Sequence, residues 1–323
     1  MHEELVPPGL GKLRHRKDLL EISQLTRQDI EDIFNTATSI RSIIGERFRK
    51  TMPTLRGRTV ALLFFEPSTR TQMSFTLAAR RLGCDLISLS ASSSSILKGE
   101  TVLDTARNIE AMDVDFVVVR HSAPGIPHLL ARHLSASVIN AGDGTHEHPT
   151  QALLDAYTIW DYFRKRNKPF NHLRILILGD ILHSRVARSD ISAFKKLGAD
   201  VAVCGPPTLI PYGIEELGVQ VYYNLPEALA DRDIIYTLRI QRERQEGSYI
   251  PTLREYIKLY GLNHNVLRKY AREDVVIMHP GPVNRGVELS PELADDPNLS
   301  LILPQVNNGV FIRMAIFYLF SPI

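Results

Sequence analysis

The sequence has little of several features that would place it in a common class of protein. Its 323 residues include only two cysteines, Cys84 and Cys204, each in or beside a strand-like run. Two isolated cysteines do not suggest a disulfide framework, so a reducing, cytoplasmic location is expected. The first residues also lack the apolar stretch of a secretory signal peptide, which agrees with that expectation.

Excess charge and long hydrophobic runs are missing as well. The formal net charge is +2, and the basic residues are scattered rather than interleaved with aromatic side chains. A nucleic-acid partner is therefore not expected. The most hydrophobic segment, VFIRMAIFYLF at 310–320, is interrupted by Arg313 and is too short to span a bilayer. It predicts a buried helix, and no membrane partner is expected.

What the sequence does contain is a regular alternation of apolar strand-like runs and helical patterns. Such alternation is typical of parallel sheets covered by helices. Two successive series, at a length of 323 residues, predict an α/β protein of two doubly wound parallel-sheet domains linked by helices. We expect an N-terminal arm of residues 1–13, a first domain of 14–150 plus 304–323, and a second domain of 151–303. The C-terminal helix is expected to pack back on the first domain.

The stretch FFEPSTRTQ places an arginine at the start of a predicted helix. A cation there is unfavourable by roughly 0.3–1 kcal/mol because the first turn already carries partial positive charge. If an anion binds at this end, Ser68, Thr69 and Thr71 add hydroxyl donors, and Arg70 becomes a charge-assisted ligand. The other interpretation is an ordinary Ser/Thr cap with an arginine that faces water. The motif alone leaves both open.

Two further segments admit a functional and an ordinary interpretation. The serine-rich run SASSSSILKGET predicts a surface loop with a solvated Lys98, or else a loop that brings Lys98 and hydroxyls to a phosphate. Arg120 ends the strand DFVVV, and ligands of such folds bind at the carboxyl ends of strands.

The segment GDGTHEHPTQ contains two histidines before a helix whose first residue is Pro149. No third ligand group accompanies His146 and His148, so a metal site is not expected. At a helix amino terminus the dipole favours a neutral imidazole, and a neutral His148 would donate to a carbonyl without adding charge.

The second half carries its own strand-end residues. No G-x-G-x-x-G follows the strand RILIL, so a nicotinamide-binding oxidoreductase is disfavoured. Arg185 lies in the turn after that strand. Arg239 and Gln241 lie at the end of another strand, DIIYTLRI, where an extended chain points both to one side. A loop HPGPVNRG follows VVIM. Solvated basic strand ends are the ordinary interpretation, and a crevice for anionic ligands is the functional one.

Seven motifs in this order resemble the aspartate/ornithine carbamoyltransferase family, and within it the chains that use aspartate. The motifs are FFEPSTRT, KGET, VVVRH, GDGTHEHPTQALLD, LRIQRER, HPGPVNRG and QVNNGVFIRMA, and the resemblance runs from about residue 14 to 320. It implies transfer of the carbamoyl group of carbamoyl phosphate to the amine of L-aspartate, with no cofactor and no metal. This reaction gives N-carbamoyl-L-aspartate and phosphate, and it is the committed step of pyrimidine biosynthesis.

The resemblance also implies roles for individual residues. Ser68, Thr69, Arg70 and Thr71 would bind the phosphate, and Arg120 would bridge the phosphate and the carbonyl oxygen. Ser94 and Lys98 match a loop that family members lend to a neighbouring subunit. His148 would polarise the carbonyl and Gln151 would contact the carbamoyl amine. Arg185 would bind the α-carboxylate, Arg239 and Gln241 the β-carboxylate, and the backbone at Gly281 and Pro282 would orient the reacting groups.

Two alternatives stay in view. Ornithine carbamoyltransferase is disfavoured because Arg239-Ile240-Gln241 suits a carboxylate rather than a cationic side chain. A catalytically silent scaffolding subunit is disfavoured by the intact Lys98, Arg120 and His148. By resemblance the chain forms a homotrimer with sites shared between subunits, and a dihydroorotase-like or regulatory partner is a further expectation of the family.

Overall fold

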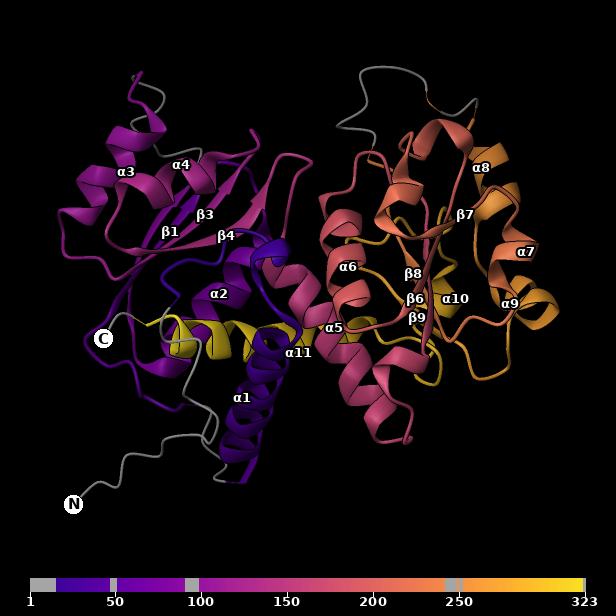
Figure 1. Cartoon of the computed structure of the whole chain (residues 1–323), viewed down its shortest axis with the longest axis horizontal. Coiled ribbons are helices and arrows are strands. Elements are labelled where there is room, and N and C mark those ends of the chain that lie inside the picture. The colour runs from indigo at the N-terminus through magenta and orange to yellow at the C-terminus, as the bar shows by residue number, and fades with distance from the viewer. Residues whose placement is uncertain (1–15, 47–50, 91–98, 242–248, 250–251, 322–323) are drawn as a thin grey trace. The chain divides into compact units, whose positions relative to one another are not determined.

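The chain forms two compact units, Met1–Leu154 with Asn307–Ile323 (unit 1) and Asp155–Val306 (unit 2) (Figure 1). The structure is a computed structural model, and it describes residues 16–46, 51–90, 99–241, 249 and 252–321. The domain boundaries expected from the sequence remain a prediction.

Unit 1 is built on a parallel sheet of four strands in the order β2-β1-β3-β4. The strands are β1 (Thr59–Phe64), β2 (Asp85–Ser90), β3 (Phe116–His121) and β4 (Ser137–Asp143). Phe64 of β1 pairs with Arg120 of β3, and His121 of β3 pairs with Asp143 of β4 after a register shift between Val119 and His121. The carboxyl ends of β1, β3 and β4 therefore lie at one edge of the sheet.

Helices cover both faces of this sheet, which is why its strands are apolar along nearly their whole length. The helices of unit 1 include α1 (Arg27–Glu46), α2 (Thr69–Leu82), α3 (Val102–Glu110) and α4 (Ile126–His133). Residues of α3 and α4 pack with Leu63, Val117 and Val138 in one buried cluster. On the other face the Phe317 ring lies edge-on to Phe75 of α2 and Phe116 of β3, 5.8 and 5.2 Å between centroids.

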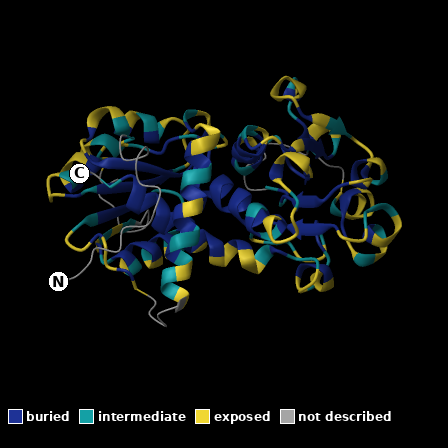
Figure 2. Cartoon of the chain, turned by 60° about the horizontal axis from the view of Figure 1, so that its bottom comes forward, coloured by how far each residue is buried: buried dark blue, intermediate teal, exposed yellow. Residues whose placement is uncertain are grey.

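Unit 2 contains a second parallel sheet, of five strands in the order β7-β6-β5-β8-β9. The strands are β5 (Arg174–Leu178), β6 (Asp200–Cys204), β7 (Gln220–Tyr222), β8 (Ile234–Thr237) and β9 (Val276–Met278). Its helices include α6 (Arg185–Lys196), α7 (Leu225–Leu229), α8 (Leu253–Tyr260), α9 (His264–Tyr270) and α10 (Pro291–Ala294). Helices α7 to α10 share a buried cluster with β5, β6, β8 and β9. The inner strands of both sheets are buried, whereas the edge strands β2 and β7 are half-buried or exposed (Figure 2).

Two long helices, α5 (Pro149–Arg164) and α11 (Ile302–Leu319), each contribute residues to both units. The predicted C-terminal helix is confirmed as α11, and its buried residues include Phe317 in the core of unit 1. None of the helices in the described ranges is long and apolar enough to cross a membrane. The fold class expected from the sequence, two parallel α/β units linked by helices, is confirmed.

The two cysteines are free and buried, one in each unit. Burial raises the pKa of the Cys84 thiol and of the Cys204 thiol to about 12 each. Both side chains are therefore protonated at neutral pH and act as small apolar core residues rather than as nucleophiles.

Candidate active site

The amino end of α2 follows the carboxyl end of β1 and contains the predicted Ser-Thr-Arg-Thr segment. Ser68 is the N-cap residue, but its side chain makes no capping hydrogen bond within the described part of the chain. Thr69 and Arg70 are exposed, whereas Thr71 is buried, and the first turn of α2 carries no acidic residue. An uncapped helix terminus without a carboxylate favours the anion-site interpretation over the simple cap.

Arg120, near the end of β3, is a buried cation of unit 1. Its guanidinium donates to Glu66 Oε1 at 2.8 Å and to the Ala141 carbonyl at 3.2 Å. The Glu66 contact ties Arg120 to the loop that precedes α2, and the Ala141 contact ties it to β4. These two contacts fix the orientation of the planar guanidinium, as bidentate recognition of an oxyanion requires.

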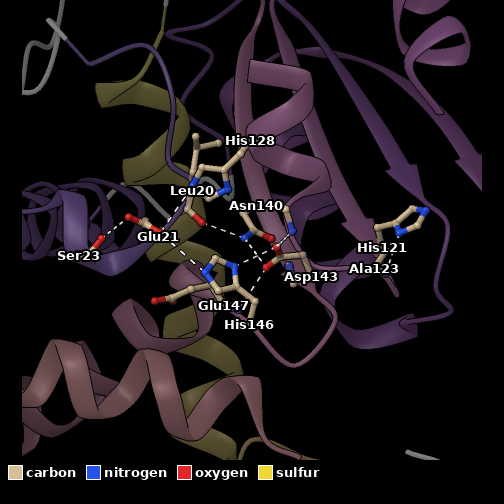
Figure 3. Close-up of polar contacts among 12 residues, drawn as sticks. Leu20, Glu21, Ser23, His121, Ala123, His128, Asn140, Asp143, His146 and Glu147 are labelled. Atoms are coloured by element: carbon tan, nitrogen blue, oxygen red, sulfur yellow. Dashed lines mark hydrogen bonds and ion pairs between the residues drawn. The ribbon is translucent and has the colours of Figure 1, made fainter. Parts of the chain in front are cut away.

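His148 directly precedes α5 and is buried, with only 3% of its surface exposed. Its carbonyl accepts from the N–H of Gln151 in the first turn of that helix, at 2.9 Å. The turn before it is held by Asp143, which ends β4 (Figure 3). His146, the other histidine of this motif, places its Nδ1 3.1 Å from Asp143 Oδ2 and does not belong to a metal-ligand group.

In unit 1 the sheet order brings these parts together. The strands β1, β3 and β4 are consecutive neighbours, and their carboxyl ends lead to Ser68–Thr71, Arg120 and His148 in turn. Residues that are scattered over 80 positions of the sequence thus share one sheet edge, where helix-terminus N–H groups, a guanidinium and an imidazole are all hydrogen-bond donors. Such a set is suited to a phosphate and an adjoining carbonyl.

In unit 2 the first predicted residue follows β5. Arg185 begins α6 and is buried, with Ser184 as N-cap accepting from Ala187 N at 3.1 Å. The turn before this helix is held by Asp180, which accepts from both the backbone N–H and Nδ1 of His183, at 3.2 and 2.8 Å. Arg185 therefore lies at the start of a helix whose preceding turn is held in place by hydrogen bonds to Asp180.

The second segment follows β8. Arg239 and Gln241 are partly exposed, and Gln241 N donates to Asp180 Oδ2 at 3.2 Å. The prediction that the strand runs on to Ile240 is wrong, because β8 ends at Thr237. Its neighbours β5 and β9 end at Leu178 and Met278, so the ladder has no further strand to continue on. Residues 238–241 instead form irregular backbone anchored by Asp180.

The third segment follows β9 and contains Gly281 and Pro282, joined by a cis peptide bond. Gly281 N donates to His279 Nδ1 at 2.7 Å, so this nitrogen carries no proton. The other ring nitrogen lies 3.2 Å from Glu288 Oε1, which also accepts from Asn284 N at 2.5 Å. A buried histidine–glutamate pair thus shapes the loop at the end of β9.

Not all predicted residues lie in the described ranges. Ser94 and Lys98 fall within 91–98, outside them. Among the residues that are described, no group of three His, Cys, Asp or Glu side chains is arranged to hold a metal ion.

The comparisons with known proteins decide the family. The profile of the carbamoyl-P binding domain of aspartate/ornithine carbamoyltransferases matches residues 17–161, and that of their Asp/Orn binding domain matches 171–320. The chain belongs to the aspartate/ornithine carbamoyltransferase family. This confirms the resemblance that the seven motifs indicated.

Two family members are similar to this chain over nearly their full length. The aspartate carbamoyltransferase catalytic subunit of Desulfosudis oleivorans is 53% identical over 94% of this chain and 95% of its own. That of Desulfotalea psychrophila is 54% identical, over 94% and 93%. Among solved structures, the Trypanosoma cruzi aspartate transcarbamoylase with carbamoyl aspartate and phosphate has a TM-score of 0.83 at 29% identity, covering 98% of both chains. An ornithine carbamoyltransferase from Pyrococcus furiosus reaches 0.80 at 30% identity, over 94% and 96%.

Four acidic residues that organise the site were not singled out from the sequence. They are Glu66, Asp143, Asp180 and Glu288. The sequence did contain a signal for two of them. Asp143 and Asp180 each come at the end of an apolar, strand-like run, and a buried carboxylate at such a place needs hydrogen-bond donors. The donors to the four residues are backbone N–H groups together with side chains of other segments, such as Arg120 for Glu66, and a sequence does not reveal these pairings.

Proposed function

We propose that the chain transfers the carbamoyl group of carbamoyl phosphate to the amine of L-aspartate, giving N-carbamoyl-L-aspartate and phosphate. The observation that carries the proposal is the set of donors at the adjoining ends of β1, β3 and β4. The solved Trypanosoma cruzi structures of the family include complexes with carbamoyl phosphate and aspartate, which supports the same pair of substrates here.

The donors of unit 1 would act on carbamoyl phosphate. Ser68, Thr69, Arg70 and Thr71 would bind the phosphate, where the positive end of α2 adds to the charge of Arg70. Arg120 and His148 would donate to the carbonyl oxygen as it becomes an oxyanion during attack. Gln151, on the first turn of α5, would contact the carbamoyl amine. Each oxyanion donor of this kind contributes roughly 3 kcal/mol of transition-state stabilisation.

The residues of unit 2 would bind the second substrate. Arg185 would take the α-carboxylate of aspartate, and Arg239 with Gln241 the β-carboxylate. The backbone at Gly281 and Pro282 would orient the amine, which attacks in its neutral form. The departing phosphate would accept the amine proton, so that the rate would come from orientation and electrostatics.

The reaction is tested by following both products. Purified enzyme with carbamoyl phosphate and L-aspartate is expected to release phosphate and form a ureido compound in equal amounts. An Arg70→Ala variant is expected to lose at least about 100-fold in kcat/KM, as for the loss of an oxyanion donor, while an Arg56→Ala variant, changed at an exposed residue of the same unit, stays active. Phosphate release without ureido product, or an unaffected Arg70→Ala variant, would contradict the proposal.

We further propose that three chains form a homotrimer in which Ser94 and Lys98 of one chain complete the site of its neighbour. Met73 and Leu77, one turn apart on α2, are 65% and 41% exposed, and such a pair suits burial against another subunit. A cytoplasmic location, the absence of a cofactor and an association with a dihydroorotase-like or regulatory chain belong to the same proposal.

Subunit mixing tests the shared site. Lys98→Ala and Arg239→Ala chains are each expected to be inactive alone. Random mixing in equal amounts is expected to restore roughly a quarter of wild-type activity, because one site in four then receives both intact residues. Mixed trimers no more active than either parent would contradict sharing, and a monomeric mass in solution would contradict the trimer.

A further inference from the structure

The carboxylate of Asp143, at the end of β4, is fully buried and has four hydrogen-bond partners (Figure 3). Its Oδ1 accepts from Asn140 Nδ2 at 2.9 Å and from Glu147 N at 3.1 Å. Its Oδ2 accepts from Gly125 N at 2.8 Å and lies 3.1 Å from His146 Nδ1. A carboxylate only accepts, so His146 donates, and all four groups converge on one side chain.

The backbone of Asp143 closes the same turn. Its N–H donates to the Glu147 carbonyl at 3.1 Å, and its carbonyl accepts from His146 N at 2.9 Å. Both main-chain groups of Glu147 are thus bound to Asp143, and the next residue along the chain is His148. The turn fixes the position from which His148 and α5 begin.

The turn also has little room to shift. Gly144 has a φ of +51°, and a Cβ there would lie 2.9 Å from the Ser122 carbonyl oxygen and from Pro124 Cδ. Gly144 N donates to the His121 carbonyl at 2.9 Å. The turn is therefore packed directly on the segment that follows β3, and Asp143 binds the same segment through Gly125 N.

We propose that Asp143 is a positioning residue for the carbamoyl transfer, which sets the place of the His148 imidazole through the 143–147 turn. This inference rests on the proposed function, in which His148 donates to the carbonyl oxygen. Asp143 does not touch the substrate. It acts because a misplacement of about 1 Å at a reacting group lowers the rate by roughly 100-fold.

The isosteric change Asp143→Asn alters the hydrogen bonds of this side chain and keeps its size, so an effect on the rate would come from the position of the turn and not from lost volume. A carboxylate offers two oxygens to the four donors, whereas an asparagine offers one oxygen and an NH₂ group. In either orientation the NH₂ group faces a backbone N–H donor, Glu147 N or Gly125 N, so at least one of the four bonds is lost and the turn shifts. The matched control is Asp113→Asn, an exposed aspartate of unit 1 with a φ of +63°, which asparagine tolerates.

The first test measures kcat and the dissociation constant of inorganic phosphate for wild type, Asp143→Asn and Asp113→Asn. We expect kcat of Asp143→Asn to fall about 10- to 100-fold, with phosphate affinity changed less than about twofold, because α2 and not the turn binds phosphate. Wild-type kcat in Asp143→Asn would overturn the inference alone. A wild type without carbamoyl transfer would overturn the proposed function first.

The second test asks whether Asp143 acts through His148. In a His148→Ala background, adding Asp143→Asn is expected to lower kcat by less than about twofold, because the group that it positions is already absent. A further loss equal to that seen in the wild-type background would show that Asp143 acts elsewhere, and would overturn the proposal.

A third pair of variants covers the case in which Asp143→Asn does not fold. His146 is 38% exposed at its side chain, so its replacement leaves the core intact. His146→Ala removes one of the four donors and is expected to lower kcat about two- to fivefold, whereas His146→Asn keeps a donor near the position of Nδ1 and is expected to restore it. Equal kcat values for these two variants would contradict the proposal.

Discussion

The turn before His148 and the segment that carries Arg239 and Gln241 are both anchored by a buried aspartate, but over different lengths of chain. Asp143 binds Glu147 N four residues away and Gly125 N 18 residues away, whereas Asp180 reaches Gln241 N, 61 residues along the chain. The first anchor is therefore the more local of the two. The second depends on the pairing of β5 with β8, so we expect the segment that carries Arg239 and Gln241 to be more sensitive to changes elsewhere in unit 2.

This difference predicts opposite kinetic behaviour. A change at the unit 1 donors is expected to lower the rate of the chemical step. A change at the unit 2 anchor is expected to act mainly on the binding of the amino acid.

The largest effect is expected for Arg120→Ala. The variant loses a donor to the phosphate and to the developing oxyanion, and leaves the Glu66 carboxylate without the partner that it has at 2.8 Å. We expect kcat to fall by about 10³-fold, measured by ureido product formation. Arg132→Ala, at an exposed arginine of α4, is the control. We take a loss of roughly tenfold in kcat as the limit for a change outside the catalytic groups. If kcat of Arg120→Ala stayed within tenfold of the wild-type value, β3 would not carry a residue that acts on the reacting groups.

A smaller effect is expected for Asp180→Asn. The amide keeps the shape of the carboxylate but places an NH₂ group against the N–H of Gln241 or the donors of His183. We expect KM for aspartate to rise about tenfold, the effect of losing roughly 1.4 kcal/mol of binding, with carbamoyl phosphate affinity unchanged.

The control for Asp180→Asn is Asp231→Asn, an exposed aspartate of unit 2 with a φ of +57°. If Asp180→Asn lowered kcat and left KM for aspartate unchanged, the contrast between the two anchors would be wrong.

The smallest effect concerns pH and His121, at the end of β3. Burial lowers the pKa of His121 from its ordinary value of 6.5. The unfolded chain therefore binds a proton more readily than the folded one, and stability is lost as the pH falls through 6.5 toward the lower folded pKa. In His121→Asn, which keeps an acceptor for Ala123 N, this contribution is absent.

Thermal unfolding at pH 7.5 and pH 5.5 measures it. Acidification is expected to lower the Tm of wild type more than that of His121→Asn, by a difference of at most about 2 °C. A larger drop in the variant than in wild type would reverse the sign and contradict the burial of a neutral imidazole.

Much of this architecture was predictable because its signals are local. The runs TVALLF and FVVVRH are apolar enough to read as strands buried on both faces, and Gly83, with a φ of +84°, ends α2 in the left-handed conformation that glycine favours. The end of β8 was not predictable, since Leu238 and Ile240 are as apolar as the strand itself. The strand ends there because its neighbours β5 and β9 end at the same level. The anchors Asp143 and Asp180 could be noticed as strand-end acids, but their partners follow only from the fold.

We infer that unit 2 supplies a site for a dicarboxylic amino acid while unit 1 supplies the phosphate site. The ratio of kcat/KM for L-aspartate to that for L-ornithine, measured with the purified chain and saturating carbamoyl phosphate, tests this division. We expect aspartate to exceed ornithine by at least about 10³-fold, because an arginine that binds a carboxylate rejects a cationic side chain. A preference for ornithine would contradict the roles given to Arg239 and Gln241 while leaving those of Arg70 and Arg120 intact.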